Sequence, residues 1–239
     1  WPAVSASLSR SATHCGEAAE LLEELADGEL QALAGERNTL SLARLLALPP
    51  LRQRNAVRHW LRQVSGAVPS AAVLARIFND VIGSRPDSEP CVCWGRLEMR
   101  RFREQLFLLP RSQPLQQAEA VNWTLVEPLR LPRAGGVLTA EPVTGNGLRA
   151  TELAAGNVRV DGRRGGERCR PAGRGHHHSL KKLFQEQGIP PWERSRIPLI
   201  YIQDQLAAVA GLWVCEPFQA GAAEQGFAIK WLPEQQNVV

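Results

Sequence analysis

The stretch from Gly162 to Tyr201 decides the fold of the second half of the chain and reads GRRGGERCRPAGRGHHHSLKKLFQEQGIPPWERSRIPLIY. Ser179 is placed to cap a helix over residues 180–187, and Gly188 followed by two prolines predicts its end. Apolar residues share one face of that helix. They are Leu180, Leu183 and Phe184. The segments PLIYI and LAAVAGLWV then predict two strands around a polar turn.

The first part of this stretch is strongly cationic. Residues 159–182 carry a net charge of +6, whereas the whole chain carries +4, so the remaining residues sum to −2. Such a run is typical of a solvated face or a tail, but here it leads directly into a helix and hairpin, which favours a binding surface for a polyanion such as RNA. The cations are Arg159, Arg163, Arg164, Arg168, Arg170, Arg174, Lys181 and Lys182.

The composition indicates a globular protein long enough for two domains. The 239 residues are 44% hydrophobic and 22% charged, which excludes a disordered chain. No apolar run approaches the ~20 residues that span a bilayer, so we expect no membrane contact. Five unevenly spaced cysteines predict no disulfide framework and favour a reducing, cytoplasmic location. The chain begins with Trp1 rather than Met, which predicts a fragment of a longer protein.

Hydrophobic spacing predicts an α+β protein in two domains, with a boundary between residues 88 and 89. Residues 1–88 are expected to form an all-α helical bundle, with helices over 11–34, 41–47, 51–64 and 71–82. Residues 89–239 are expected to form an α+β domain of antiparallel strands with one main helix. We expect a linker hairpin at 91–110, short strands with wide loops over 111–150, and an edge strand at 227–231.

The predicted helices of the first domain differ in charge. The helix over 11–34 has an acidic face, whereas Arg54, Arg58 and Arg62 form a stripe at i, i+4 and i+8 on the helix over 51–64. Two interpretations remain open: the two helices complement each other in charge, or the arginine stripe contacts RNA.

No motif predicts catalysis or metal binding. The sequence has neither a G-x-x-x-x-G-K-[ST] phosphate loop nor a G-x-S-x-G elbow. Cys91 and Cys93 lie too close for ordinary zinc spacing, and no second pair of cysteines completes a site. Consecutive histidines cannot all face one ion, so we expect His176 and His177 to extend the cationic loop and donate to phosphates. The sequence therefore predicts a binding module without catalytic or metal-binding residues.

Three segments closely resemble the bacterial tRNA(Ile)-lysidine synthetases. The run GGERCRPAGRGHHHSLKKLFQEQGIPPWERSRIPLIYIQDQLAAVAGLWV (165–214) is similar to the C-terminal domain of that family. The run LARLLALPPLRQRNAVRHWLR (42–62) is similar to its helical middle domain, and WGRLEMRRFREQLFLLP (94–110) to the passage between them. The resemblance covers nearly all of residues 1–232 and is weakest over 111–150.

The resemblance implies a ligase that uses ATP, with Mg²⁺, to join L-lysine to the wobble cytidine (C34) of a tRNA(Ile) with a CAU anticodon. The catalytic S-G-G-x-D-S motif of the family is missing, so this chain alone is expected to be inactive and to bind tRNA. The alternative is a protein-interaction module, with a homodimer as one form. The implied tRNA contacts are Arg168, Arg170, Arg174, His176, His177, Lys181, Lys182, Arg194, Arg196, Arg54, Arg58 and Arg62.

Overall fold

The computed structural model describes residues 2–35, 38–85, 88–111, 120–155 and 158–234. The chain divides into two compact units, Trp1–Ser112 and Gln113–Gln235. This boundary differs from the expected one at 88/89, because the strands of the expected linker hairpin pack within the first unit. No helix in these ranges is long and apolar enough to cross a membrane.

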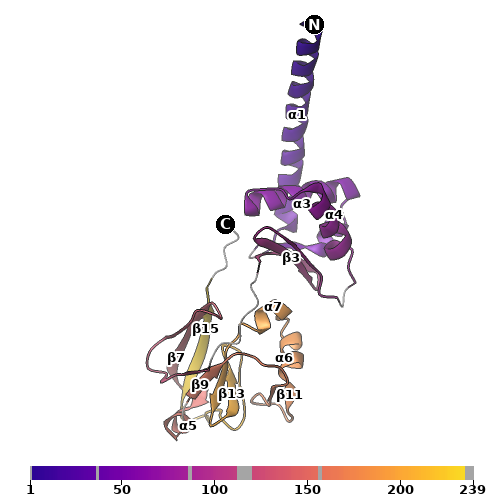
Figure 1. Cartoon of the computed structure of the whole chain (residues 1–239). Helices are drawn as coiled ribbons and strands as arrows, with labels where there is room; N and C mark the ends of the chain where they lie inside the picture. The colour runs from indigo at the N-terminus through magenta and orange to yellow at the C-terminus, as the bar shows by residue number, and fades with distance from the viewer. Residues whose placement is uncertain (1, 36–37, 86–87, 112–119, 156–157, 235–239) are drawn as a thin grey trace. The chain divides into compact units, whose positions relative to one another are not determined.

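Local signals account for the helices of the first unit (Figure 1). Prolines open the third helix and Gly66, with φ of 73°, ends it, as the left-handed position after a helix requires. The Oγ atoms of Ser41 and Ser70 cap the second and fourth helices. The helices are α1 (Pro2–Leu33), α2 (Leu42–Leu46), α3 (Pro50–Ser65), α4 (Ala71–Arg76) and the π-helix η1 (Ile77–Ile82).

The first unit also contains a sheet, so the expected all-α bundle is not what forms. Four antiparallel strands lie in the order β1-β4-β3-β2. Alternate residues of the strands, Val92, Met99, Leu106 and Leu108, are buried in one core with α2, α3 and η1. This shared core explains why residues 91–110 belong to the first unit. The strands are β1 (Thr39–Ser41), β2 (Cys91–Trp94), β3 (Leu97–Phe102) and β4 (Gln105–Pro110).

Much of α1 lies outside that core. Residues 3–25 are exposed, and the first buried residue of the helix is Ala26. Figure 1 shows these N-terminal turns extending beyond the other helices of the unit. Leu8, Leu21 and Leu22 are at least half exposed on this part of the helix.

The second unit is built from two larger antiparallel sheets and one small one. Their strand orders are β14-β13-β12-β9-β5, β6-β7-β15-β8 and β10-β11. The expected edge strand at 227–231 is in fact the middle of the nine-residue β15, which lies between β7 and β8. Strand β7 also has nine residues, so residues 111–150 hold more than short strands.

The helices α6 and α7, both labelled in Figure 1, follow β11 in the chain and precede β12. The elements of the second unit are β5 (Val121–Asn122), β6 (Leu129–Leu131), β7 (Gly136–Thr144), β8 (Leu148–Arg149), α5 (Ala150–Ala155), β9 (Val158–Asp161), β10 (Arg168–Cys169), β11 (His178–Ser179), α6 (Leu180–Glu186), α7 (Pro191–Arg194), β12 (Leu199–Ile202), β13 (Gln205–Val209), β14 (Trp213–Val214) and β15 (Gln225–Pro233).

Candidate nucleic-acid interface

The basic loop begins as a turn held by two carboxylates. Asp161, at the end of β9, accepts hydrogen bonds from the backbone N–H of Gly162 at 2.7 Å and from Arg164 Nη2 at 2.8 Å. Glu167 accepts from the backbone N–H groups of Arg164 and Gly165. Gly165 has a φ of 95°, a conformation that favours glycine. These carboxylates therefore shape the loop and pair with its arginines.

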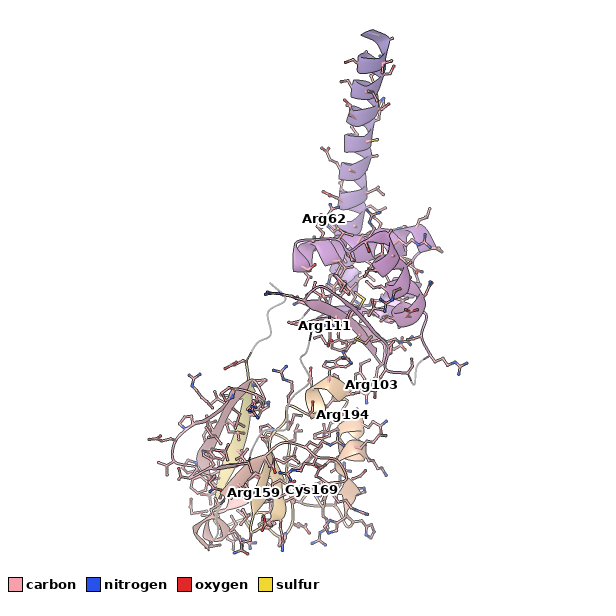
Figure 2. All side chains as sticks on the ribbon, in the orientation of Figure 1. Arg62, Arg103, Arg111, Arg159, Cys169 and Arg194 are labelled. Carbon is pink, nitrogen blue, oxygen red and sulfur yellow. A yellow bond between two sulfur atoms is a disulfide. The ribbon has the colours of Figure 1, made fainter. Side chains whose placement is uncertain are left out.

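A two-stranded hairpin carries the next part of the loop. Cys169 in β10 pairs with His178 in β11, and Arg168 Nη2 donates to the carbonyl of His177 at 3.3 Å. A disulfide joins Cys169 to Cys215, which lies 46 residues further on. The expectation that no cysteines pair was wrong for these two, because the fold brings the hairpin beside the residue that follows β14. Figure 2 labels Cys169 in the second unit.

The helix α6 carries two exposed lysines, and its opposite face is buried. Its apolar face, Leu180, Leu183 and Phe184, is fully buried, and the Phe184 ring lies 5.5 Å from that of Trp213. Lys181 and Lys182 occupy the exposed side of this helix. Within the described ranges, neither lysine takes part in an ion pair. Their ammonium groups are therefore available to an anionic ligand.

Most arginines of the loop do have carboxylate partners. Arg170 Nη2 lies 2.6 Å from Glu216 Oε2, and Arg174 Nη1 lies 2.7 Å from Glu186 Oε2. The Arg174 guanidinium lowers the pKa of Glu186. Arg159 bonds to Asp204 at 3.0 Å. With Asp161 and Glu167, five carboxylates thus face the eight cations of residues 159–182, which leaves a local charge of +3 rather than +6.

Two further arginines of the predicted set hold backbone carbonyls. Arg194 is only 6% exposed, and its Nε donates to the carbonyl of Ile189 at 2.8 Å. Arg196 Nε donates to the carbonyl of Ala134 at 3.1 Å, and burial lowers the pKa of Arg196. By contrast, His176 and His177 are exposed between β10 and β11. The loop and α6 therefore offer a more accessible surface than α7 does.

On α3, part of the arginine stripe faces the acidic helix. Arg62 forms an ion pair with Glu23 of α1, and Figure 2 labels it where the two helices meet. His59 Nε2 of α3 lies 2.7 Å from Asp27 Oδ1 of α1. These contacts support charge complementarity between the helices. Arg54 and Arg58 are exposed and form no ion pair within the described residues.

These features define a class of protein: a two-unit α+β protein with a cationic surface on its second unit. The cations lie on a loop that a disulfide joins to the residue after β14 and on a short helix whose other face is buried. Residues 40–107 match the family described as TilS substrate binding domain, and residues 158–231 match the one described as TilS substrate C-terminal domain. The chain therefore belongs to the tRNA(Ile)-lysidine synthase family.

Several relatives carry that name. The tRNA(Ile)-lysidine synthase of Coxiella burnetii is 40% identical over 98% of this chain and 51% of its own length, and that of Methylococcus capsulatus is 40% identical over 98% and 54%. The chain thus spans about half the length of the curated relatives it matches. A crystal structure of a TilS C-terminal domain, at 26% identity and a TM-score of 0.38, covers 48% of this chain and 98% of its own.

Proposed function

We propose that this chain is the tRNA-recognition part of a ligase that attaches lysine to the wobble cytidine, C34, of an isoleucine tRNA. Both matched domain families support the proposal, since both are described as substrate domains. In the whole protein, the tRNA(Ile) with a CAU anticodon would be presented to a catalytic domain that uses ATP, Mg²⁺ and L-lysine. The task of the residues in this chain is to bind and orient RNA in the cytoplasm.

One observation carries the proposal furthest: the unpaired cations on the rigid base of α6. Lys181 and Lys182 stand on a helix whose other face is fully buried, and Arg168 lies on the adjoining hairpin without a carboxylate partner in the described ranges. A helix that is already anchored loses little backbone freedom when its lysines meet phosphates. We propose these three as the leading contacts, followed by the exposed His176 and His177.

The paired arginines form a second set. Arg170 and Arg174 would have to leave Glu216 and Glu186 to reach a phosphate, so we propose that they contribute less. Arg194 and Arg196 support the site through backbone carbonyls. On α3, we propose Arg54 as an RNA contact together with Arg58, whereas Arg62 is engaged by α1.

A charge-reversal experiment tests the proposal. Labelled isoleucine tRNA is titrated with the chain at low salt, and a tRNA with another anticodon serves as competitor. We expect the chain to bind the isoleucine tRNA, and we expect the double variant Lys181→Glu with Lys182→Glu to abolish this binding. The third lysine of the chain provides a matched control, because Lys230 lies in β15 and pairs with Glu141 at 2.5 Å. Equal binding by the double variant and by Lys230→Glu would remove α6 from the interface.

A second candidate function is a protein contact through α1. The exposed leucines of its N-terminal turns, with Leu8 at 66% and Leu21 at 67%, favour it. Light scattering over a range of concentrations tests for a homodimer. If the helix makes no self-contact, the double variant Leu8→Glu with Leu21→Glu should have the same mass as the parent chain at all concentrations.

A further inference from the structure

Two thiols lie on an unexpected side of the first unit's sheet. Along β2, Val92 points into the apolar core, so the side chains of Cys91 and Cys93 point to the opposite face. Cysteines that serve only as packing groups are found among apolar side chains. These two instead share their face with a charged pair on the neighbouring strand, which calls for another explanation.

The register of the sheet completes a set of ligands that residue spacing alone does not reveal. In β3, Glu98 is the partner of Cys93 and Arg100 is the partner of Cys91. The two Sγ atoms lie 3.5 Å apart, and both lie within 4.8 Å of a Glu98 carboxylate oxygen. Two thiolates at ~2.3 Å from a tetrahedral zinc ion are about 3.8 Å apart. The side chains therefore need only a small adjustment to meet one ion.

We propose that Cys91, Cys93 and Glu98 bind one thiophilic divalent cation of the zinc class. Two sulfur ligands and one carboxylate oxygen would leave a fourth position for water. Arg100 would act in the outer shell, because its Nε already donates to Glu98 Oε1 at 2.8 Å and so orients the carboxylate.

The charges of the site balance in both states. Without metal, two neutral thiols accompany the Glu98–Arg100 ion pair. With metal, two thiolates and one carboxylate are offset by the divalent ion and the Arg100 guanidinium. Burial, together with the Cys93 thiol, raises the pKa of Cys91 to about 11.

Cobalt(II) is the probe for this site, because sulfur ligands give it a charge-transfer absorption and a tetrahedral site gives it strong visible bands. The full chain carries His176→Ala, His177→Ala and His178→Ala, which removes the three consecutive histidines of the cationic loop as competing ligands. We expect one cobalt ion per chain with thiolate absorption. Zinc should displace it and magnesium should not, since magnesium prefers oxygen ligands.

Variants locate the ligands. Cys91→Ser or Cys93→Ser should weaken cobalt binding by about tenfold or more and reduce the sulfur absorption, and Arg100→Gln should weaken it to a similar degree through the outer shell. Cys15→Ser removes an exposed free thiol and is the matched control. The proposal fails if the parent chain shows no thiolate absorption, or if Cys15→Ser lowers that absorption as much as Cys91→Ser. The parent measurement decides even if a variant does not fold.

Discussion

The salt dependence of tRNA binding separates the unpaired cations from the paired ones. Each phosphate that a protein neutralises contributes about 0.7 to 0.9 to the slope of log affinity against log salt. Arg168, Lys181 and Lys182, which have no carboxylate partner in the described ranges, predict a contribution of about −2 to −3 to the slope. Arg54 and Arg58 of α3 bring the slope for the chain to about −3.5 to −4.5. All eight cations of residues 159–182 acting together predict about −6 to −7 instead.

Lys181→Ala with Lys182→Ala should therefore flatten the slope by about 1.4 to 1.8. The assay is fluorescence anisotropy of labelled isoleucine tRNA over about 50 to 200 mM salt. Lys230→Ala should leave the slope unchanged, and Arg174→Ala should change it by less than either lysine, because Arg174 is bound to Glu186. An unchanged slope in the double lysine variant, or a slope steeper than about −5 in the parent chain, refutes the reasoning.

Three more predictions concern the support of this surface. Phe184→Ala should destabilise the second unit by about 3–5 kcal/mol in urea unfolding, because the ring is fully buried against Trp213; a loss below about 1 kcal/mol contradicts this. Reducing the disulfide of Cys169 should lower the unfolding free energy by about 2–4 kcal/mol. Because the pKa of Glu186 is lowered, its ion pair with Arg174 is fully formed above the ordinary carboxyl pKa and is lost as the pH falls through the lowered pKa. In Arg174→Ala, NMR titration should show that the pKa of Glu186 rises.

Local signals in the sequence predict elements whose causes are local. The helix expected over 51–64 is observed as Pro50–Ser65, since apolar spacing, prolines and a glycine specify it within one segment. The helix expected over 180–187 is observed as Leu180–Glu186 for the same reason. Strand β1 has only three residues and its partner β4 begins 64 positions later in the chain, at Gln105. No local pattern reveals such a pairing, so the sequence predicts the hairpin at 91–110 but neither β1 nor the four-stranded sheet that it completes.

The candidate site shows the same division between local and distant causes. Counting charges along residues 159–182 identifies the cations correctly, but the carboxylates of Asp204 and Glu216 come from later segments. The partner of Cys169 is equally distant in sequence. In β2, the C-x-C spacing indicates the proposed metal site. In a strand this spacing places both thiols on one face, where a residue of the neighbouring strand can complete the set of metal ligands.

The central position of β15 has a consequence for the order in which the second unit folds. Strand β7 and its partner β6 are made early, yet its second partner, β15, begins at Gln225, paired with Thr144. During synthesis, β7 and β8 must therefore wait for some 80 residues before their sheet can close, and the strand edges that β15 covers stay unpaired meanwhile. The sheet β12–β13, whose strands are neighbours in the chain, has no such delay. We expect the half of the unit that carries the cations to form first and the β15 sheet to close last.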